Sequence, residues 1–138
     1  MPYIIWRSRM SVGIDRIDED HKQLIRCVND LDQATNQANY DPRLAAQTLL
    51  RLFEYTKSHF DREEKLMLAV DYPDFDAHKL QHDNAKRMLQ DISEEFMEQP
   101  TKPAAERIYK FAAEWLVQHI LMMDMKIVPH IAKSGGTP

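Results

Sequence analysis

The sequence is poor in cysteine and in glycine, and both scarcities exclude classes of fold. Cys27 is the only cysteine among 138 residues, so no disulfide framework can form within the chain. Three glycines leave few positions for the tight turns on which β-rich domains depend. An apolar core therefore has to hold the chain together, and helices are favoured over strands. We expect Cys27 to be a packed residue rather than a nucleophile.

Long hydrophobic runs and clusters of basic residues are also missing. No apolar run approaches the roughly 20 residues that span a bilayer, so we expect no membrane insertion. The opening, MPYIIWRSRM, lacks the charged start, long apolar stretch and small-residue cleavage site of a signal peptide, so we expect a cytoplasmic location. A formal net charge of −4 without a basic cluster argues against a nucleic-acid partner.

Apolar residues recur three and four positions apart in four long segments, which is the pattern of amphipathic helices. These segments are residues 18–38, 42–70, 75–98, and from 103 or 104 to about 119. Asp41 followed by Pro42 is a good N-cap with proline at the first helical position. Four helices joined by short breaks predict an all-α fold, an up-down-up-down antiparallel four-helix bundle.

The two ends of the chain differ from these regular segments. Residues 3–6 are too apolar for a free tail, so we expect an extended N-terminal arm, residues 1–11, packed on the outside of the bundle. Residues 120–131 are apolar but contain Asp124 and Pro129, which predicts a change of direction near Asp124 and a short C-terminal helix. We therefore expect one domain over residues 1–138, with its core at about 12–132 and a frayed tail at 133–138.

Five of the six histidines and two carboxylates fall into a pattern typical of a metal site. The seven residues are His21, His59, Glu63, His78, His82, His119 and Asp124. Residues four apart on a helix share one face, so His59 with Glu63, and His78 with His82, each direct two ligand atoms to one place. Asp124 follows His119 by five residues.

The apolar stripes predict that these histidines point inward, and this would be costly without a ligand. A buried polar group without a partner costs about 1–3 kcal/mol, and five such losses rival the roughly 5–15 kcal/mol that stabilises a whole domain. Imidazole suits transition metals, and a carboxylate between two cations stays ionised. Five imidazoles and two carboxylates can therefore hold two metal ions, one of them with an open position for a small ligand.

The chain lacks the spacing of ferritin-like di-iron proteins. That pattern needs Glu-x-x-His pairs on two helices, and no glutamate in this chain is followed three residues later by histidine. A carboxylate-rich site suits the activation of dioxygen, whereas this site is rich in histidine. The composition of the site favours reversible binding of a small molecule over oxidative catalysis.

Four sequence motifs together resemble the hemerythrin family, specifically its single-domain bacterial members. They are IDEDHKQL at residues 17–24, HFDREE at 59–64, His78 with His82, and WLVQHI at 115–120 with Asp124. Trp6 and Tyr72 match as well, and the resemblance covers about residues 5–131.

The resemblance implies a non-haem di-iron centre that binds dioxygen. His78, His82 and His119 would bind one iron, and His21 and His59 the other. Glu63 and Asp124 would bridge the two ions beside an oxo or hydroxo group. Dioxygen would bind at the iron with two histidines, and nitric oxide, azide or other small anions are further possible ligands. The resemblance names no protein partner.

The family also places bulky apolar residues beside the open position. On matching positions these are Phe60, Trp115 and Leu116, which would exclude water and anions from the bound ligand. Met122 and Met123 stand where the family often has a small residue or threonine before the aspartate. We include Met123 in the expected pocket, where it would narrow the space.

Two other functions have to be weighed against reversible binding of dioxygen. The same centre could belong to an enzyme that handles nitric oxide or peroxide, or to a regulatory module that responds to iron or oxygen. Continuous turnover would distinguish the enzyme, and a partner captured only with or without oxygen would distinguish the module.

We expect Glu64 to be a solvated surface charge and His130, which fits no ligand spacing, to lie outside the site.

Overall fold

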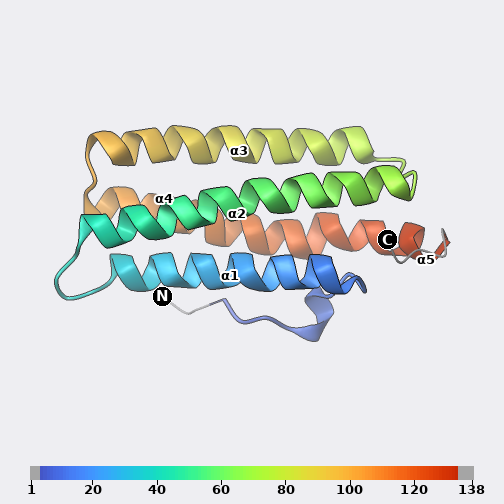
Figure 1. Cartoon of the computed structure of the whole chain (residues 1–138), viewed down its shortest axis with the longest axis horizontal. Helices are drawn as coiled ribbons and strands as arrows, with labels where there is room; N and C mark the ends of the chain where they lie inside the picture. Colours follow the sequence, from blue (N-terminus) through green and yellow to red (C-terminus); the bar gives the residue numbers. More distant parts are fainter. Residues whose placement is uncertain (1–3, 134–138) are drawn as a thin grey trace.

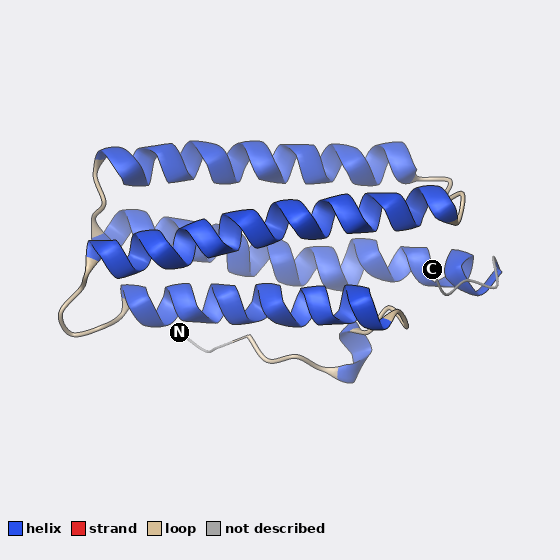
Figure 2. Cartoon of the chain, in the orientation of Figure 1, coloured by secondary structure: helices blue, strands red, loops and turns tan. Residues whose placement is uncertain are grey.

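The computed structural model describes residues 4–133, and every regular element in this range is helical (Figures 1 and 2). The elements are η1 (Ser8–Met10), α1 (Asp15–Thr35), α2 (Pro42–Ala69), α3 (Phe75–Glu98), α4 (Lys102–Gln118), η2 (His119–Met123), η3 (Asp124–Ile127) and α5 (Val128–Lys133). The four long helices run alternately up and down beside each other, which confirms the predicted antiparallel bundle (Figure 1).

Side-chain caps set the starts of α2 and α4. The carboxylate of Asp41 accepts a hydrogen bond from the backbone N–H of Arg43 at 2.9 Å, and Pro42 occupies the first turn, as the sequence predicts. The Thr101 hydroxyl accepts from the backbone N–H of Ala104 at 3.3 Å. Because Thr101 caps it, α4 begins at Lys102, slightly earlier than the expected start.

Helix α1 begins and ends three residues earlier than the sequence pattern predicts. Asp18 does not cap it, because its carboxylate accepts hydrogen bonds from the Ser11 hydroxyl and from the backbone N–H of Val12, which orders the preceding loop. At the other end, the Thr35 hydroxyl and the Asn36 amide donate to backbone carbonyls one turn earlier. Such local bonds compete with continuation of the helix.

The N-terminal arm lies along α1 on the outside of the bundle, as predicted (Figure 1). The Asn29 side chain binds the arm at both backbone groups of Ile4, with distances of 3.0 and 2.9 Å. Farther along, Met10, Val12 and Ile14 are buried. Tyr3 of the expected arm and residues 134–138 of the expected tail lie outside the described residues.

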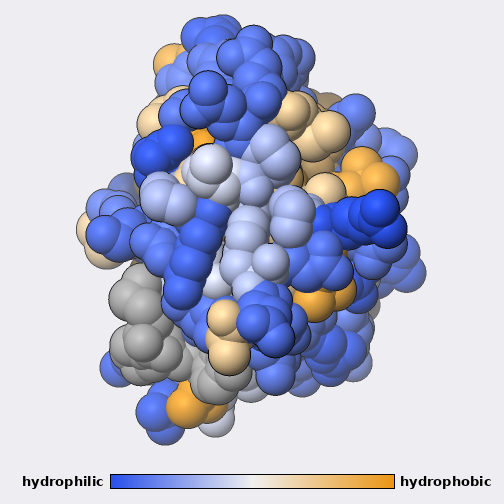
Figure 3. Space-filling view, turned by 90° about the vertical axis from the view of Figure 1, so that its left-hand side faces the viewer, coloured by the Kyte–Doolittle hydropathy of each residue, from blue (hydrophilic) through white to orange (hydrophobic). Residues whose placement is uncertain are grey.

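A polar layer separates two apolar clusters inside the bundle. The larger cluster includes Leu24, Leu52 and Ile108, and the smaller one includes Ile17 and Ile127. Seven buried histidine and acidic side chains lie between them, toward the end where α2 turns into α3, since Glu63 is six residues before the end of α2 and His78 is three residues after the start of α3. The opposite end of the bundle is mostly hydrophilic, with separate hydrophobic patches (Figure 3).

Candidate metal centre

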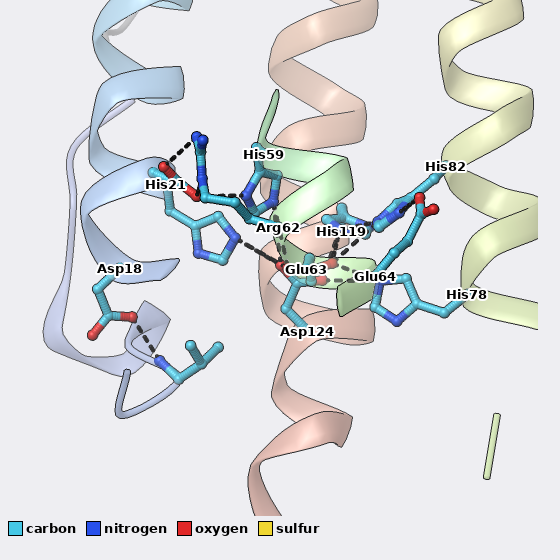
Figure 4. Close-up of polar contacts among 12 residues, drawn as sticks. Asp18, His21, His59, Arg62, Glu63, Glu64, His78, His82, His119 and Asp124 are labelled. Carbon is cyan, nitrogen blue, oxygen red and sulfur yellow. Dashed lines mark hydrogen bonds and ion pairs between the residues drawn. The ribbon is translucent and has the colours of Figure 1, made fainter. Parts of the chain in front are cut away.

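All seven side chains predicted from their spacing come together inside the bundle (Figure 4). Helix α1 contributes His21, α2 contributes His59 and Glu63, α3 contributes His78 and His82, and the segment after α4 contributes His119 and Asp124. None of them is more than 2% exposed. Residues from 21 to 124 therefore meet in one water-excluded layer.

The ligand atoms form two groups that share a carboxylate. One group is Glu63, His78, His82 and His119, and the other is His21, His59, Glu63 and Asp124; within each group the ligand atoms lie within 4.8 Å of one another. A single ion could occupy the centre of each group. Figure 4 shows the carboxylates between the histidines of α1 and those of α3.

Glu63 presents one oxygen to each group. Its Oε1 lies 2.9, 3.1 and 3.2 Å from Nε2 of His78, His82 and His119. Its Oε2 lies 3.4 Å from Nε2 of His59 and 3.7 Å from Nε2 of His21. This is the orientation that a carboxylate needs in order to bridge two ions.

Asp124 is divided in the same way. Its Oδ1 lies 2.7 Å from Nε2 of His119 and 3.2 Å from Nε2 of His78. Its Oδ2 lies 2.7 Å from Nε2 of His21 and 4.0 Å from Nε2 of His59. Two carboxylates thus face both groups of histidines from neighbouring positions.

Apart from the hydrogen bonds of Glu63 Oε1 with Nε2 of His82 and of His119, these short approaches are not aligned hydrogen bonds. Nε2 of His21, His59 and His78, Oε2 of Glu63 and both carboxylate oxygens of Asp124 have no aligned hydrogen-bond partner among the described residues. Two ligand atoms about 2.1 Å from one ion and at right angles lie about 3.0 Å apart, close to the separations seen here. Converging lone pairs at this spacing fit a pair of metal ions.

A π-helical turn brings His119 and Asp124 to the same side. In a regular α-helix five residues correspond to a rotation of about 500°, which leaves the two side chains roughly 140° apart. From His119 to Met123 the chain is π-helical, and the backbone N–H of Asp124 donates to the carbonyl of His119. This wider turn places residues five apart on one face, and such turns are frequent at functional sites.

Without metal, protons on the imidazoles balance the two buried carboxylates. Burial acts to lower the pKa of His21, but Asp124 and Glu63 outweigh it and raise the pKa to about 9. The same opposition raises the pKa of His119 to about 10. Burial acts to raise the pKa of Asp124 and of Glu63, yet the surrounding imidazoles hold both pKa values below the ordinary range.

Glu64 is not the solvated surface charge that the sequence predicts. Its side chain is only 15% exposed, and its Oε2 accepts a hydrogen bond from Nδ1 of His82 at 3.0 Å. Helix α3 covers the face of α2 on which Glu64 lies, so a residue next to a ligand becomes part of the site. Its place directly after Glu63, facing the His-x-x-x-His helix, was the available signal.

Asp20 and Arg62 also adjoin the site, and the sequence pattern did not single them out. Asp20 is 2% exposed and receives two hydrogen bonds of 2.7 Å from the guanidinium of Arg62. Its Oδ2 also lies 3.5 Å from Nδ1 of His59. Only the pairing of α1 with α2 brings these three residues together, which is why spacing along the chain does not reveal them.

Two of the expected pocket residues stack on histidines of the site. Phe60 is fully buried and lies parallel to the His82 ring at a centroid distance of 3.9 Å. Trp115 stacks on His119 at 4.5 Å and meets Phe60 edge to face at 5.3 Å. These contacts restrict the rotation of both imidazoles.

An apolar cavity of about 20 Å³ adjoins the metal centre on the side of the larger apolar cluster. Its lining is Leu24, Val28, Leu52, Thr56, Ala85, Leu89, Phe111, Ala112, Trp115 and Leu116. Leu24, Thr56, Ala85 and Leu116 each stand three residues from a histidine of the site on their own helix. The Thr56 hydroxyl donates to the Leu52 carbonyl at 2.7 Å, so its proton is not available to a water molecule, and apart from Thr56 and Trp115 the lining side chains are purely hydrocarbon.

Three remaining residues have simpler surroundings. Met123 is half-buried and is not part of the cavity lining, so its role in a pocket stays a prediction. His130 lies outside both groups and meets the ring of Tyr72 at 5.1 Å. Cys27 is half-buried against the larger apolar cluster, and burial raises the pKa of its thiol.

Comparison with known families matches this geometry. A family model described as the hemerythrin HHE cation binding domain matches residues 12–131. The chain belongs to the hemerythrin family. The match covers the four long helices and all seven converging side chains.

Several hemerythrins resemble the chain over most of its length. A myohemerythrin from Theromyzon tessulatum is 31% identical over 121 residues, which cover 88% of each chain. A bacteriohemerythrin from Pseudomonas aeruginosa is 28% identical over 134 residues, or 97% of this chain and 85% of that protein. A crystal structure of wild-type hemerythrin superposes with a TM-score of 0.82 at 26% identity, covering 95% of this chain and 99% of the other.

Between residues 4 and 133, no helix of the hemerythrin domain combines the length and the apolar character that crossing a bilayer requires.

Proposed function

We propose that this hemerythrin domain binds dioxygen reversibly at a pair of iron ions, as an oxygen carrier, store or sensor. The observation that supports this most is the division of Glu63 and Asp124, each of which offers one oxygen to either group of histidines. This arrangement suits two neighbouring cations. Without them, the burial of so many polar groups would cost folding free energy.

On this proposal the two groups hold one iron each. His78, His82 and His119 would hold the first iron, and His21 and His59 would hold the second. Glu63 and Asp124, each of which faces both groups, would serve both ions. When bound, the iron pair supplies the two electrons that reversible dioxygen binding requires.

The unequal number of histidines decides where a small ligand enters. The group with His21 and His59 has one imidazole fewer than the other, so one position remains free after both carboxylates are counted. The cavity lies one turn away from both histidines, bounded there by Leu24 and Thr56. Dioxygen is small and apolar, and a dry cavity of this kind favours it over water and anions.

A spectroscopic experiment tests the proposal. Aerobically purified protein should carry close to two irons per chain and absorb in the near-ultraviolet and visible range. Dithionite should bleach this absorption, and air should restore it over repeated cycles. A matched pair of variants, His119→Ala and His130→Ala, removes a histidine inside and outside the site. Loss of the cycle in both variants, or its absence from the native protein, would count against the proposal.

The alternative as an enzyme makes a different prediction for the same sample. If the centre reduces nitric oxide or peroxide, the protein should consume that substrate continuously when a reductant is present. We propose that it instead binds one small ligand per centre and stops, and that azide and nitric oxide compete with dioxygen. A cytoplasmic location and the absence of turnover both remain part of the proposal.

A further inference from the structure

The five histidines of the proposed metal centre differ in what faces Nδ1, the ring nitrogen that points away from the two carboxylates. Nδ1 of His82 donates to the carboxylate of Glu64 at 3.0 Å, and Nδ1 of His59 lies 3.5 Å from the carboxylate of Asp20. Nδ1 of His21, His59, His78 and His119 makes no aligned hydrogen bond among the described residues, so the contact of His59 with Asp20 is one of proximity and charge. Each group of metal ligands therefore contains one imidazole backed by a carboxylate that is not itself a ligand.

The contact with Glu64 decides the tautomer of His82. An ionised carboxylate can only accept a hydrogen bond, so the proton of the neutral imidazole has to be on Nδ1. The lone pair is then on Nε2, which lies 3.1 Å from Glu63 Oε1 and 3.2 Å from His119 Nε2, where the ion would be. Phe60 stacks on the same ring, so both its orientation and its tautomer are fixed before metal binds.

The two supporting carboxylates are held differently. Arg62 donates two hydrogen bonds of 2.7 Å to Asp20. The positive charge of Arg62 therefore neutralises much of the negative charge of Asp20 that would act on His59. The nearest cation to Glu64 is the ammonium of Lys79 at 3.9 Å, which also lies 3.0 Å from Asp83. Glu64 thus acts on its imidazole at shorter range and with less compensation than Asp20 does.

We propose that Glu64 and Asp20 are positioning residues of the metal centre, one for each group of histidines, and that they set how strongly His82 and His59 donate to the metal. The inference rests on the function proposed above. A carboxylate that accepts a hydrogen bond from an imidazole, as Glu64 does from His82, makes that imidazole a stronger donor, and a nearby carboxylate such as Asp20 acts in the same direction through its charge. A stronger donor stabilises the more oxidised metal. Because dioxygen binding withdraws electrons from the iron pair, both carboxylates favour dioxygen binding.

Substitutions of Asp20 and of its neighbour Arg62 should shift the reduction potential of the centre in opposite directions, which tests the proposal. Glu64→Gln and Asp20→Asn should raise the reduction potential of the oxidised centre, weaken dioxygen binding, and lower metal affinity by about tenfold or more. Arg62→Gln should shift the potential in the opposite direction, because Asp20 then acts on His59 without a compensating cation. In the Asp20→Asn background, the effect of Arg62→Gln should shrink.

Matched controls separate this role from a loss of folding. Asp32 is another buried aspartate of α1, 5% exposed, and its carboxylate accepts from the Asn36 amide at 2.7 Å. Asp61 is an exposed acid on the same helix as Glu64. Asp32→Asn and Asp61→Asn should leave the potential of the centre unchanged. In zinc-loaded, ¹⁵N-labelled protein, Glu64→Gln should move the Nδ1 resonance of His82 and leave that of His119 in place.

The possible outcomes distinguish this inference from the function it rests on. If every variant binds two irons and cycles with air, but Glu64→Gln and Asp20→Asn shift the potential no more than the controls, the positioning role is wrong. A shift of Arg62→Gln in the same direction as Asp20→Asn would overturn the account of Asp20. If the native protein takes up no iron, the proposed function fails, while the zinc-loaded spectra still decide whether Glu64 controls His82.

Discussion

At the scale of single residues, the centre is built from side chains that are unfavourable where they stand. Buried imidazoles and carboxylates cost folding free energy unless each finds a partner. In the metal-free chain they partner one another, as the raised pKa values of His21 and His119 and the lowered pKa of Asp124 indicate. On the proposed function, a pair of cations would replace those protons and satisfy all seven side chains together.

Replacing a histidine of the site should therefore affect both metal content and stability. His119 approaches Asp124 at 2.7 Å and Glu63 at 3.2 Å, so His119→Ala removes a ligand and leaves two carboxylates less compensated. We expect the variant to lose iron and to melt at a lower temperature than the native protein, since metal binding and folding are coupled. Iron analysis and calorimetry measure both effects, and His130→Ala should change neither.

Leu116 should protect the site without holding the metal. It is 3% exposed and lines the cavity one turn from His119. Leu116→Ala should retain two irons, lose about 2–5 kcal/mol of stability and autoxidise faster, because the larger cavity admits water and anions.

Leu31 supplies the control for this prediction, since it is fully buried in the same apolar cluster but does not line the cavity. Leu31→Ala should lose a similar free energy of unfolding with no change in autoxidation rate, which is followed by the decay of visible absorption in air. Equal autoxidation rates in the two variants would remove Leu116 from the pocket.

At the scale of elements, helix ends and one irregular turn position the site. Regular helices align His59 with Glu63 and His78 with His82, but His119 and Asp124 need the π-helical turn between Gln118 and η3. Side-chain caps at Asp41 and Thr101 set where α2 and α4 begin, and so help to set where their ligands lie along the bundle.

The caps of α2 and α3 give a direct comparison at this scale. Asp41 accepts a hydrogen bond from Arg43 at the start of α2, whereas Asp74, in the same position before α3, makes no side-chain cap bond. Asp41→Ala should lower the free energy of unfolding by about 0.5–2 kcal/mol, and Asp74→Ala by clearly less. Urea unfolding followed by circular dichroism measures the difference, and equal losses would contradict the assignment of Asp41 as the cap.

At the scale of the whole molecule, the proposed metal centre joins all four long helices in a layer between the two apolar clusters. Each helix, or the segment that continues it, contributes at least one side chain to the layer. Metal binds the folded arrangement and not the extended chain, so the ions should act as a crosslink between elements that are distant in sequence.

Removing the metal should therefore destabilise the entire bundle. At a free metal concentration a hundredfold above its dissociation constant, each ion adds about 2.7 kcal/mol to the free energy of unfolding. Reduction followed by an iron chelator should lower the melting temperature, and adding ferrous iron without oxygen should restore it. Calorimetry of the His119→Ala protein, which should show no such recovery, is the control.

Metal affinity should rise with pH over the range in which the site holds protons. In the metal-free protein the pKa values are about 9 for His21 and about 10 for His119, above the ordinary 6.5. Both imidazoles are thus protonated at pH 7 to 8.5, and metal has to displace two protons. Apparent affinity should rise up to about a hundredfold per pH unit there and level off above pH 10.

Calorimetric titrations in buffers of different ionisation enthalpy count the protons that metal releases. Close to two protons per chain are expected at pH 7.5 from these two histidines. Release of none would show that the imidazoles are neutral before metal binds. The same raised pKa values imply that the metal-free fold loses stability as pH rises from about 6.5 to between 9 and 10, because over this range the unfolded chain has released protons that the folded state still holds.

Much of the architecture follows from local patterns in the chain. Apolar periodicity predicts the four helices, and α3 ends at Glu98 as expected. The spacing of four between ligands on one helix predicts which side chains point inward together, and the structure brings all seven into one layer. Their role as iron ligands stays a prediction, as does that of Met123.

Other parts of the site depend on contacts between elements that no local pattern encodes. Glu64 is predicted to be a surface charge from its neighbours in sequence, yet α3 covers it and His82 binds it. Asp20 meets His59 and Arg62 only because α1 packs on α2. Asp124 and Pro129 in an apolar segment predict a change of direction near Asp124, but not the π-helical form that the chain takes before it.

The sequence by itself determined which residues are helical, which faces are apolar and which side chains can ligate a metal, because these depend on spacing along one helix. Only the tertiary structure decided that each of Glu63 and Asp124 offers an oxygen to both groups, and that Glu64 and Asp20 stand behind two of the histidines. Those relations join atoms on different helices, and their distances are set by how the helices pack.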